Sequence, residues 1–156
     1  MKIQVMKTLF LLSLMMGIAN VTARAQGLID DTAIEADVPH AFIVRDTTLP
    51  AGKYTIKRVD YTQPNALEIR SADGRRAVIF ETESTRATET PRQAEFVFDT
   101  VGEQYFLSKI WVTDSDIGYQ LPKTKAQKRL EGSGMQAEHH SIFARLSKLR
   151  DQHQKE

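Results

Sequence analysis

The side chains that could do chemistry in this chain of 156 residues are few and scattered. Cysteine is absent, which excludes disulfides, thiol catalysis and cysteine-ligated zinc. The four histidines are His40, His139, His140 and His153. On a helix His139 and His140 would point about 100° apart, so they could not face one metal ion together as an i, i+4 pair does. The sequence therefore predicts isolated surface histidines, no metal site and no cofactor.

Two aspartates and two aromatic residues are the remaining candidates for a site. Asp114 and Asp116 match the start of a calcium loop, but Lys125 stands where that loop needs its closing bidentate Glu. We interpret the pair as part of a polar loop between a strand and a helix. Trp111 and Tyr105 could stack on a sugar ring, but alternating positions in the most hydrophobic segment favour the core. No G-x-S-x-G, H-E-x-x-H or Gly-rich phosphate loop occurs, so no catalytic residue is predicted.

Short strands between turn signals would position these side chains. The expected strands are Ala36–Arg45, Lys53–Asp60, Ala66–Ser71, Arg76–Glu81, Glu95–Thr100 and Gln104–Thr113. The last of these carries apolar groups on both faces, because Phe106, Ile110 and Val112 should alternate with Tyr105, Leu107 and Trp111. A strand covered on both sides is typical of a closed or strongly curled sheet. The sequence predicts an all-β fold, a small antiparallel barrel or sandwich of about six to seven strands with a C-terminal helical segment.

The pattern changes to helical spacing near the C-terminus. Pro122 can begin a helix through Lys123–Glu131, and the glycines at 132 and 134 would end it. A second helix is expected over Gln136–Gln152, where a stripe at i, i+1, i+4 and i+7 is formed by Ile142, Phe143, Leu146 and Leu149. The expected units are a signal peptide at 1–25, a polar leader at 26–33, a β domain at 34–121 and a basic helical tail at 122–156.

Charge separates the body of the chain from its tail. Residues 26–121 hold 10 basic and 16 acidic residues, and residues 122–156 hold 8 basic and 4 acidic ones. An acidic body argues against nucleic-acid binding, which needs a positive face to neutralise phosphates. The basic tail helix could contact a membrane surface or a partner. Docking on its own acidic domain is favoured, because it involves no association entropy.

The N-terminal residues have the features of a removable export signal. Lys2 and Lys7 make the first seven residues positive, and Thr8–Ala19 is an uncharged apolar run of 12 residues. That run is too short for a transmembrane span, which needs about 20 residues. The small residues Ala23 and Ala25 mark a cleavage site that would leave Gln26 as the new N-terminus. We therefore expect a protein exported to the periplasm or the extracellular space, with no transmembrane span.

Four segments together resemble a known family. They are VPHAFIVRDTTLPAGKYTI (Val38–Ile56), LEIRSADGRRAVIF (Leu67–Phe80), GEQYFLSKIWV (Gly102–Val112) and GYQLPKTKAQKRLE (Gly118–Glu131). The chain is similar in them to an uncharacterised family of small exported β proteins of Acidobacteria, with its "VPF-F-V…LPAG-Y-V" opening, "YFL…W" hairpin and "ELPKS" close. The resemblance implies an exported β domain and implies no activity. His40 stands where the family usually has Phe, and the segment after Gly134 extends past the family's usual end.

These features predict an exported, non-enzymatic β protein that acts by binding or assembly. Its partner would be an envelope or extracellular component, or a second copy of the chain. The alternative is a small hydrolase or lyase of envelope polymers, with a site assembled from dispersed Asp, Glu and His residues. A deep pocket lined by two carboxylates, or by a carboxylate and a His, would favour the enzyme. A filled interior with an exposed apolar patch would favour binding or assembly.

Overall fold

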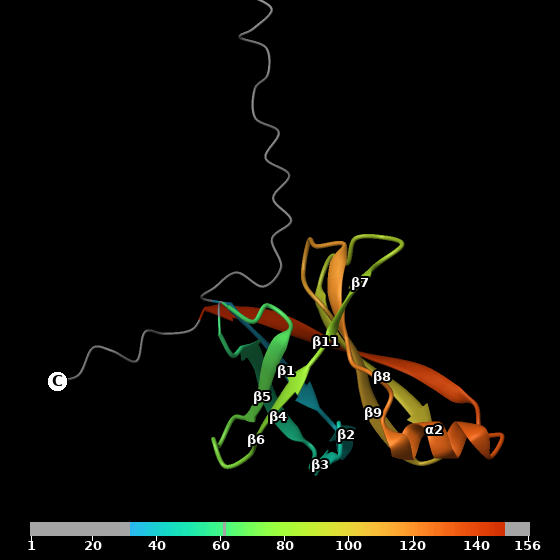
Figure 1. Ribbon diagram of the computed structural model, residues 1–156. Helices are drawn as coiled ribbons and strands as arrows, with labels where there is room; N and C mark the ends of the chain where they lie inside the picture. Colours follow the sequence, from blue (N-terminus) through green and yellow to red (C-terminus); the bar gives the residue numbers. More distant parts are fainter. Residues whose placement is uncertain (1–31, 61, 149–156) are drawn as a thin grey trace, which may run out of the picture.

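Short strands dominate the part of the chain that the structure describes, which is residues 32–60 and 62–148 of this computed structural model. In chain order (Figure 1) the elements are β1 (Thr32–Val38), β2 (Phe42–Val44), β3 (Thr47–Leu49), β4 (Gly52–Arg58), β5 (Ala66–Ser71), β6 (Ala77–Glu81), β7 (Glu83–Arg86), β8 (Ala94–Val101), β9 (Gln104–Trp111), β10 (Ile117–Gln120), α2 (Lys125–Gly132) and β11 (Ala137–Lys148). All of these strands belong to one 11-stranded sheet. The predicted all-β fold is confirmed in its coarse form, with more strands than predicted.

The sheet nearly closes into a barrel. Its main path runs β3-β2-β9-β8-β11-β1-β4-β5-β6. Only Thr82 separates β6 from β7, so residues 77–86 act as one bent strand. The first half of that strand pairs with β5, and the second half pairs with β10. Because β10 also pairs with β9, the path returns to the other side of the sheet. This return gives the fold its barrel-like form.

The C-terminal segment is a strand, so the predicted helix over Gln136–Gln152 is wrong for its described part. β11 pairs with β8 through residues 137–144 and with β1 through residues 145–148. Figure 1 shows β11 crossing from the end of α2 to the start of β1. Ala144 is buried and Ile142 packs against the core, whereas Phe143 and Arg145 point outward. Of the expected apolar stripe, only Ile142 packs on the core in the described part, and pairing with the edges of β8 and β1 decides for the strand.

The strand also changes what the basic tail can do. Residues 137–148 pair with β8 and β1 of their own domain, but they do so as a strand and not as the docked helix that was expected. The alternative of a basic amphipathic helix on a membrane surface loses its basis there, because no such helix forms. Among the described residues, α2 is the single helix, and none is long and apolar enough to span a membrane.

The first predicted helix is confirmed as α2, although it begins at Lys125 rather than Lys123. Thr124 is its N-cap, and its hydroxyl oxygen accepts a hydrogen bond from the Gln127 N–H at 3.0 Å. Such a cap fixes the first residue of a helix, because it satisfies an otherwise unpaired donor. Ser133 caps the other end, so the predicted break after Glu131 is also confirmed.

A β-bulge in β9 changes which side chains share a face. Val97 pairs with Lys109, but Phe98 pairs with Leu107, so Ser108 is an extra residue in β9. The Ser108 hydroxyl donates a hydrogen bond to the Val97 carbonyl oxygen at 3.1 Å. An extra residue reverses the alternation of inward and outward side chains along the strand.

The bulge overturns part of the alternation expected for β9. Ile110 and Val112 face the core as predicted, but Phe106 lies on the opposite face. Leu107 joins the core instead, and Trp111 remains on the outer face. A single sequence does not reveal the bulge, because Ser108 is as ordinary in a regular strand as in a bulge.

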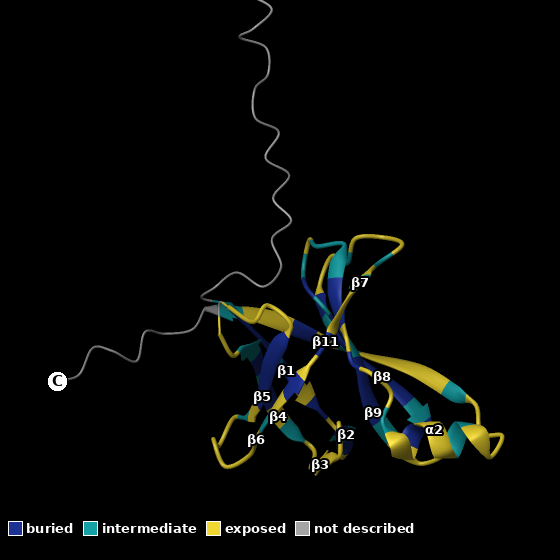
Figure 2. Cartoon of the chain, viewed as in Figure 1, coloured by how far each residue is buried: buried dark blue, intermediate teal, exposed yellow. Residues whose placement is uncertain are grey.

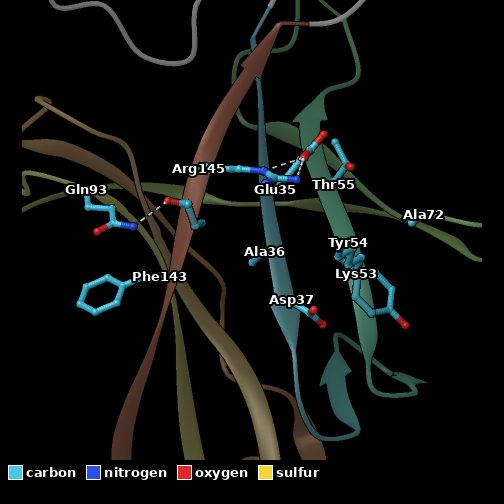
Figure 3. Close-up of a pocket in the computed structure, with 11 residues that line it drawn as sticks. Glu35, Ala36, Asp37, Lys53, Tyr54, Thr55, Ala72, Gln93, Phe143 and Arg145 are labelled. Carbon is cyan, nitrogen blue, oxygen red and sulfur yellow. Dashed lines mark hydrogen bonds and ion pairs between the residues drawn. The ribbon is translucent and has the colours of Figure 1, made fainter.

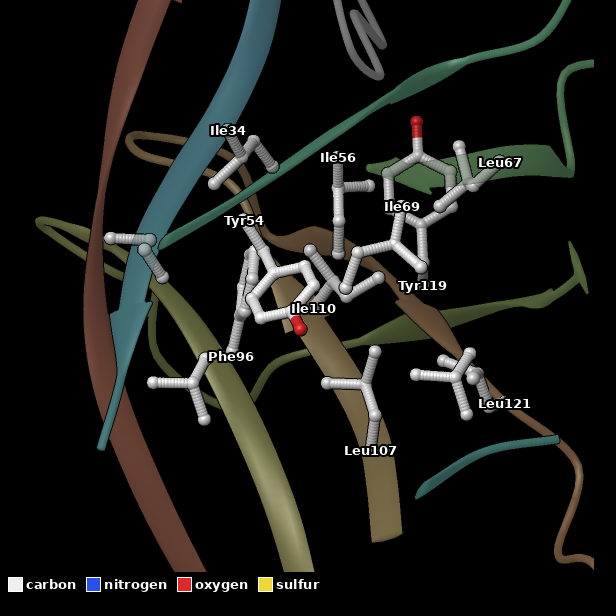
Figure 4. Packing of buried hydrophobic residues seen from close by; sticks show 14 of the residues in the cluster. Ile34, Tyr54, Ile56, Leu67, Ile69, Phe96, Leu107, Ile110, Tyr119 and Leu121 are labelled. Carbon is white, nitrogen blue, oxygen red and sulfur yellow. The ribbon is translucent and has the colours of Figure 1, made fainter. Parts of the chain in front are cut away.

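The interior of the barrel is filled by side chains (Figure 4). The largest fully buried ones are aromatic and aliphatic, among them Phe42, Phe96, Phe98, Ile56, Leu67 and Ile69. Each such side chain contributes about 1.5–3 kcal/mol by leaving water. A core of this kind explains how the domain folds without a disulfide.

Predicted strand boundaries agree with the structure where the adjoining turn contains Gly or Asp. β5 has the predicted bounds, and Gly74 and Gly102 adopt positive φ in the turns that follow β5 and β8. In the first of these turns Asp73 accepts hydrogen bonds from the Ser71 hydroxyl and the Arg75 N–H, which hold the pKa of its carboxyl below the usual range. The turn is thus fixed by local side-chain contacts.

Three short strands and two boundaries differ from expectation. β3, β7 and β10 were not predicted, because runs of three or four residues carry little periodic signal. The expected strand Ala36–Arg45 is divided after Val38, where Pro39 cannot donate to a ladder. β1 begins at Thr32, inside the expected polar leader. The predicted cleavage residues Ala23, Ala25 and Gln26 lie outside the described residues.

Candidate functional site

A row of three outward side chains crosses the sheet on strands β9, β8 and β11. Trp111 is directly opposite Glu95, and Glu95 is directly opposite Phe143. Opposed residues of an antiparallel pair project from the same face. Their sequence neighbours Ile110 and Ala144 are buried in the core, so the row projects outward. We call Trp111, Glu95 and Phe143 the aromatic row.

Both aromatic members of the row are accessible. Phe143 is 66% exposed, and Trp111 is half-buried. The indole ring lies over Gly118 of β10: a Cβ built there would be 2.5 Å from Cζ3 of Trp111 and 2.8 Å from the Ile110 carbonyl oxygen. A glycine is needed at this position for the ring to pack so closely. The ring is therefore backed by β10.

Two hollows flank the aromatic row. One, of about 420 Å³, lies where β11 and β1 diverge, and Phe143, Arg145, Glu35 and Lys53 line it (Figure 3). The other, of about 490 Å³, is lined by the segment 86–92 together with Glu95, Lys109 and Trp111. The row is thus an accessible ridge between two concave surfaces.

Opposite charges are matched around these hollows. Glu35 and Arg145 form an ion pair with two contacts of 3.1 Å across β1 and β11. Arg86 pairs with Asp116 at 3.0 Å beside the second hollow. Such exposed pairs contribute at most about 1 kcal/mol each, so they shape the surface more than they stabilise the fold.

Tyr54 closes the floor of the first hollow. It is almost fully buried, and its hydroxyl donates a hydrogen bond to the Pro50 carbonyl oxygen at 2.8 Å. Burial raises the pKa of the Tyr54 phenol above its ordinary value, because the phenolate is poorly solvated there. The phenol is therefore a neutral structural group at physiological pH.

A polar network beneath α2 is the second candidate site. Asp99 of β8 is 6% exposed and accepts hydrogen bonds from Nε2 of Gln127 and Nδ1 of His139, both at 2.9 Å. Gln127 also donates to Glu131 at 3.2 Å, and Lys123 pairs with Glu131 at 2.7 Å. A buried carboxylate needs such partners, because an unpaired one is strongly destabilised. The network joins α2 and β11 to the sheet.

A polar residue, Gln127, is the buried side chain of α2. The neighbouring residue Ala126 is exposed. The amide donor of Gln127 reaches Asp99. Sequence analysis did not predict Asp99 or Gln127 as partners, since they lie 28 residues apart.

The carboxylate–imidazole pair in this network resembles half of a general-base arrangement. The Asp99 carboxylate lies 2.9 Å from Nδ1 of His139 and orients the imidazole, with 69% of the His139 side chain exposed. Within the described residues, however, no hydroxyl or other nucleophile bonds to Nε2, and neither hollow includes His139. The arrangement can orient an imidazole, and it lies apart from both hollows.

The other histidines lie elsewhere. His140 points to the opposite side of β11 from His139, because adjacent strand residues alternate. His40 stacks on Tyr105 with ring centroids 3.7 Å apart and meets the edge of Phe98 at 5.5 Å. Its Nδ1 is buried without a hydrogen-bond partner. His40 is thus an aromatic packing residue, and His153 lies outside the described residues.

The aspartate pair is part of a loop between two strands, not between a strand and a helix. Asp114 adopts φ of 56°, and Asp116 is held by Arg86. In residues 32–60 and 62–148, no group of three or more His, Asp or Glu side chains could hold a metal ion.

The aromatic row was missed because the sequence placed its members in different elements. Trp111 was noted, but Phe143 was assigned to a helix and Glu95 to the start of a strand. The pair Phe143-Ala144, in which the large residue faces out and the small one faces in, is the local signal that a strand would give.

Comparisons of this chain with protein-family models, with curated proteins and with solved structures gave no match.

Proposed function

We propose that this chain is an exported, non-enzymatic protein of the cell envelope or extracellular space that acts by binding or assembly through the aromatic row. The observation that carries the proposal is the row of two accessible aromatic side chains, Phe143 and Trp111, on one outward sheet face with Glu95 between them. Two accessible aromatic side chains in one row, with a hollow on either side, form a surface that contact with another molecule would bury.

The filled core supports a surface function. In the part of the chain that the structure describes, aromatic and aliphatic side chains pack together inside the barrel (Figure 4). The two hollows are on the outside, where they would add contact area around the row. Figure 2 shows dark-blue buried stretches in the strands, whereas exposed residues lie along α2 and the adjacent part of β11.

Export is supported by the N-terminal sequence and by the resemblance to small exported β proteins of Acidobacteria. A positive start, a short apolar run and the Ala23-Arg24-Ala25 motif are the parts of a removable signal. The mass of the protein recovered from a bacterial host tests this step. Cleavage after Ala25 should give a chain that begins at Gln26, and retention of the first 25 residues on the exported protein would contradict it.

Co-sedimentation with envelope material tests the binding surface. The mature chain from Gln26 to Glu156 is mixed with the envelope fraction of the producing cells, and the pelleted protein is measured. Phe143→Ser should strongly reduce pelleting. Ile79→Ser is the matched control, because Ile79 is 64% exposed on β6 and lies outside the row. Equal pelleting of wild type and both variants, or no pelleting at all, would contradict the proposal.

A second candidate function rests on the Asp99–His139 pair. A small hydrolase or lyase of envelope polymers could use His139 as a general base, oriented by the buried carboxylate. Release of soluble products from envelope polymers, compared between wild type and His139→Gln, tests it. Loss of release in the variant would support the enzyme, and absence of release by the wild type would remove this candidate.

A further inference from the structure

The aromatic row has a charged residue at its centre, which bears on the kind of ligand it fits. Glu95 separates Trp111 from Phe143, and Lys109 lies two residues before Trp111 on the same strand face. The core of a protein–protein interface is usually a continuous apolar patch depleted of charge. Two rings divided by a carboxylate do not form such a patch. A ligand that alternates apolar faces with hydrogen-bonding groups fits better.

Sugar chains have this alternation. The C–H groups on the face of a pyranose ring pack on the electron-rich face of an aromatic ring, and the hydroxyl groups at the ring edge take hydrogen bonds. Glu95 can accept and Lys109 can donate hydrogen bonds to those hydroxyls. Trp111 is well suited to stacking because β10 backs its ring.

The strand spacing gives the length of chain that would span the row. Trp111 and Phe143 lie on strands separated by β8, so their backbones are about 10 Å apart. That distance is close to the length of one disaccharide unit in an extended β-1,4-linked glycan. In such a chain every second ring presents the same face, so both aromatic residues could stack on one chain.

The charges near Trp111 balance, which favours a neutral ligand. Glu89 and Glu95 line the second hollow together with Arg92 and Lys109. The remaining cation of this hollow, Arg86, already pairs with Asp116. A polyanion such as a nucleic acid would need a surplus of cations on the surface that it contacts.

We infer that the aromatic row binds a neutral, extended β-1,4-linked polysaccharide, with Trp111 and Phe143 stacked on two rings of one chain. Glu95 and Lys109 bond to hydroxyls of the sugar between them. This inference rests on the proposed function and names its ligand.

Oligosaccharide titration tests the inference. The probes are cello- and chito-oligosaccharides of increasing length, with malto-oligosaccharides of equal length as the α-linked control. Trp111 is the chain's single Trp, so its fluorescence reports binding directly, and calorimetry gives the affinity. Affinity for one of the β-linked series should rise until the chain spans the row. Phe143→Ser should weaken binding about tenfold, which is typical for loss of one stacking ring.

Controls keep this inference separate from the proposed function. Phe143 is largely exposed, so Phe143→Ser should fold normally, and Ile79→Ser should bind like the wild type. Absence of binding to both β-linked series, or equal affinity of wild type and Phe143→Ser, overturns the inference. If envelope pelleting then persists and disappears after protease treatment of the envelope, the ligand is a protein and the proposed function survives. If pelleting is absent as well, the proposed function fails too.

Discussion

Gly118→Ala tests the packing that holds Trp111 in the aromatic row. The new methyl group would lie 2.5 Å from Cζ3 of Trp111, closer still to Cε3, and 2.8 Å from the Ile110 carbonyl oxygen. Carbon atoms in contact are normally about 3.5–4.0 Å apart. The indole ring must therefore move by about 1 Å or more, and the carbonyl belongs to the backbone of the neighbouring strand β9. Overpacking of this kind costs about 1–3 kcal/mol, and we expect the upper half of that range.

Urea unfolding followed by circular dichroism measures the cost. Gly118→Ala should lower the midpoint with little change in the slope m, and the emission of the single Trp should change in the folded state. Gly132→Ala is the matched control, because no atom lies within 4 Å of a Cβ built there. That variant should be as stable as the wild type, or slightly more stable, since Gly132 is the last residue of α2 and Ala favours the helical conformation more than Gly does.

A double variant separates the two contacts. In Trp111→Ala the ring is gone, so adding Gly118→Ala should cost less than it does in the wild type, with the contact to the Ile110 carbonyl remaining. If Gly118→Ala has wild-type stability and wild-type Trp emission, the ring does not lie over Gly118, and the support of the aromatic row by β10 is refuted.

The remaining predictions concern the polar network, the aromatic end of the core and the buried phenol. Asp99→Ala should destabilise by about 2–3 kcal/mol in urea, because the buried Gln127 amide loses one of its two acceptors and His139 loses its partner; a loss below about 0.5 kcal/mol would contradict the network. His40→Phe should stabilise by about 1 kcal/mol, since it removes an unpartnered buried nitrogen and keeps the ring; a lower thermal midpoint would refute this. The pKa of Tyr54 is raised in the folded state. The neutral phenol therefore contributes fully to stability below about pH 10, its pKa in the unfolded chain, and this contribution is lost as the pH rises through the pKa in the folded state. The stability measured from pH 9 to 11 should fall more steeply for the wild type than for Tyr54→Phe. At neutral pH the variant should be less stable by about 1 kcal/mol, because the hydrogen bond to the Pro50 carbonyl is lost. Parallel curves would contradict the raised pKa of Tyr54.

Local chemistry made part of the fold predictable. The strand Ala66–Ser71 ends at a turn whose Asp73 and Gly74 carry their own signal, and its predicted bounds match β5. The helix α2 was likewise foreseen from Pro122 and the glycines after it. In both cases the residues that end the element lie next to it in sequence, so one sequence contains the information.

Long-range strand pairing explains which features of the structure were not predicted from the sequence. β11 is a strand because it pairs with the edges of β8 and β1, and its partner residues lie 36 or more positions earlier in the chain. The bulge at Ser108 similarly depends on the register with Val97. Trp111, Glu95 and Phe143 become neighbours only through these pairings, which is why the candidate site could not be assembled from spacing alone.

Photo-crosslinking in producing cells tests most directly whether the aromatic row is the contact surface. A photoreactive phenylalanine analogue is placed at position 143 in one strain and at position 79 in another, since both wild-type side chains are about equally exposed. We predict a light-dependent adduct of the exported protein from position 143 and none from position 79. An adduct from position 79 alone, or no adduct from either position, would contradict the account.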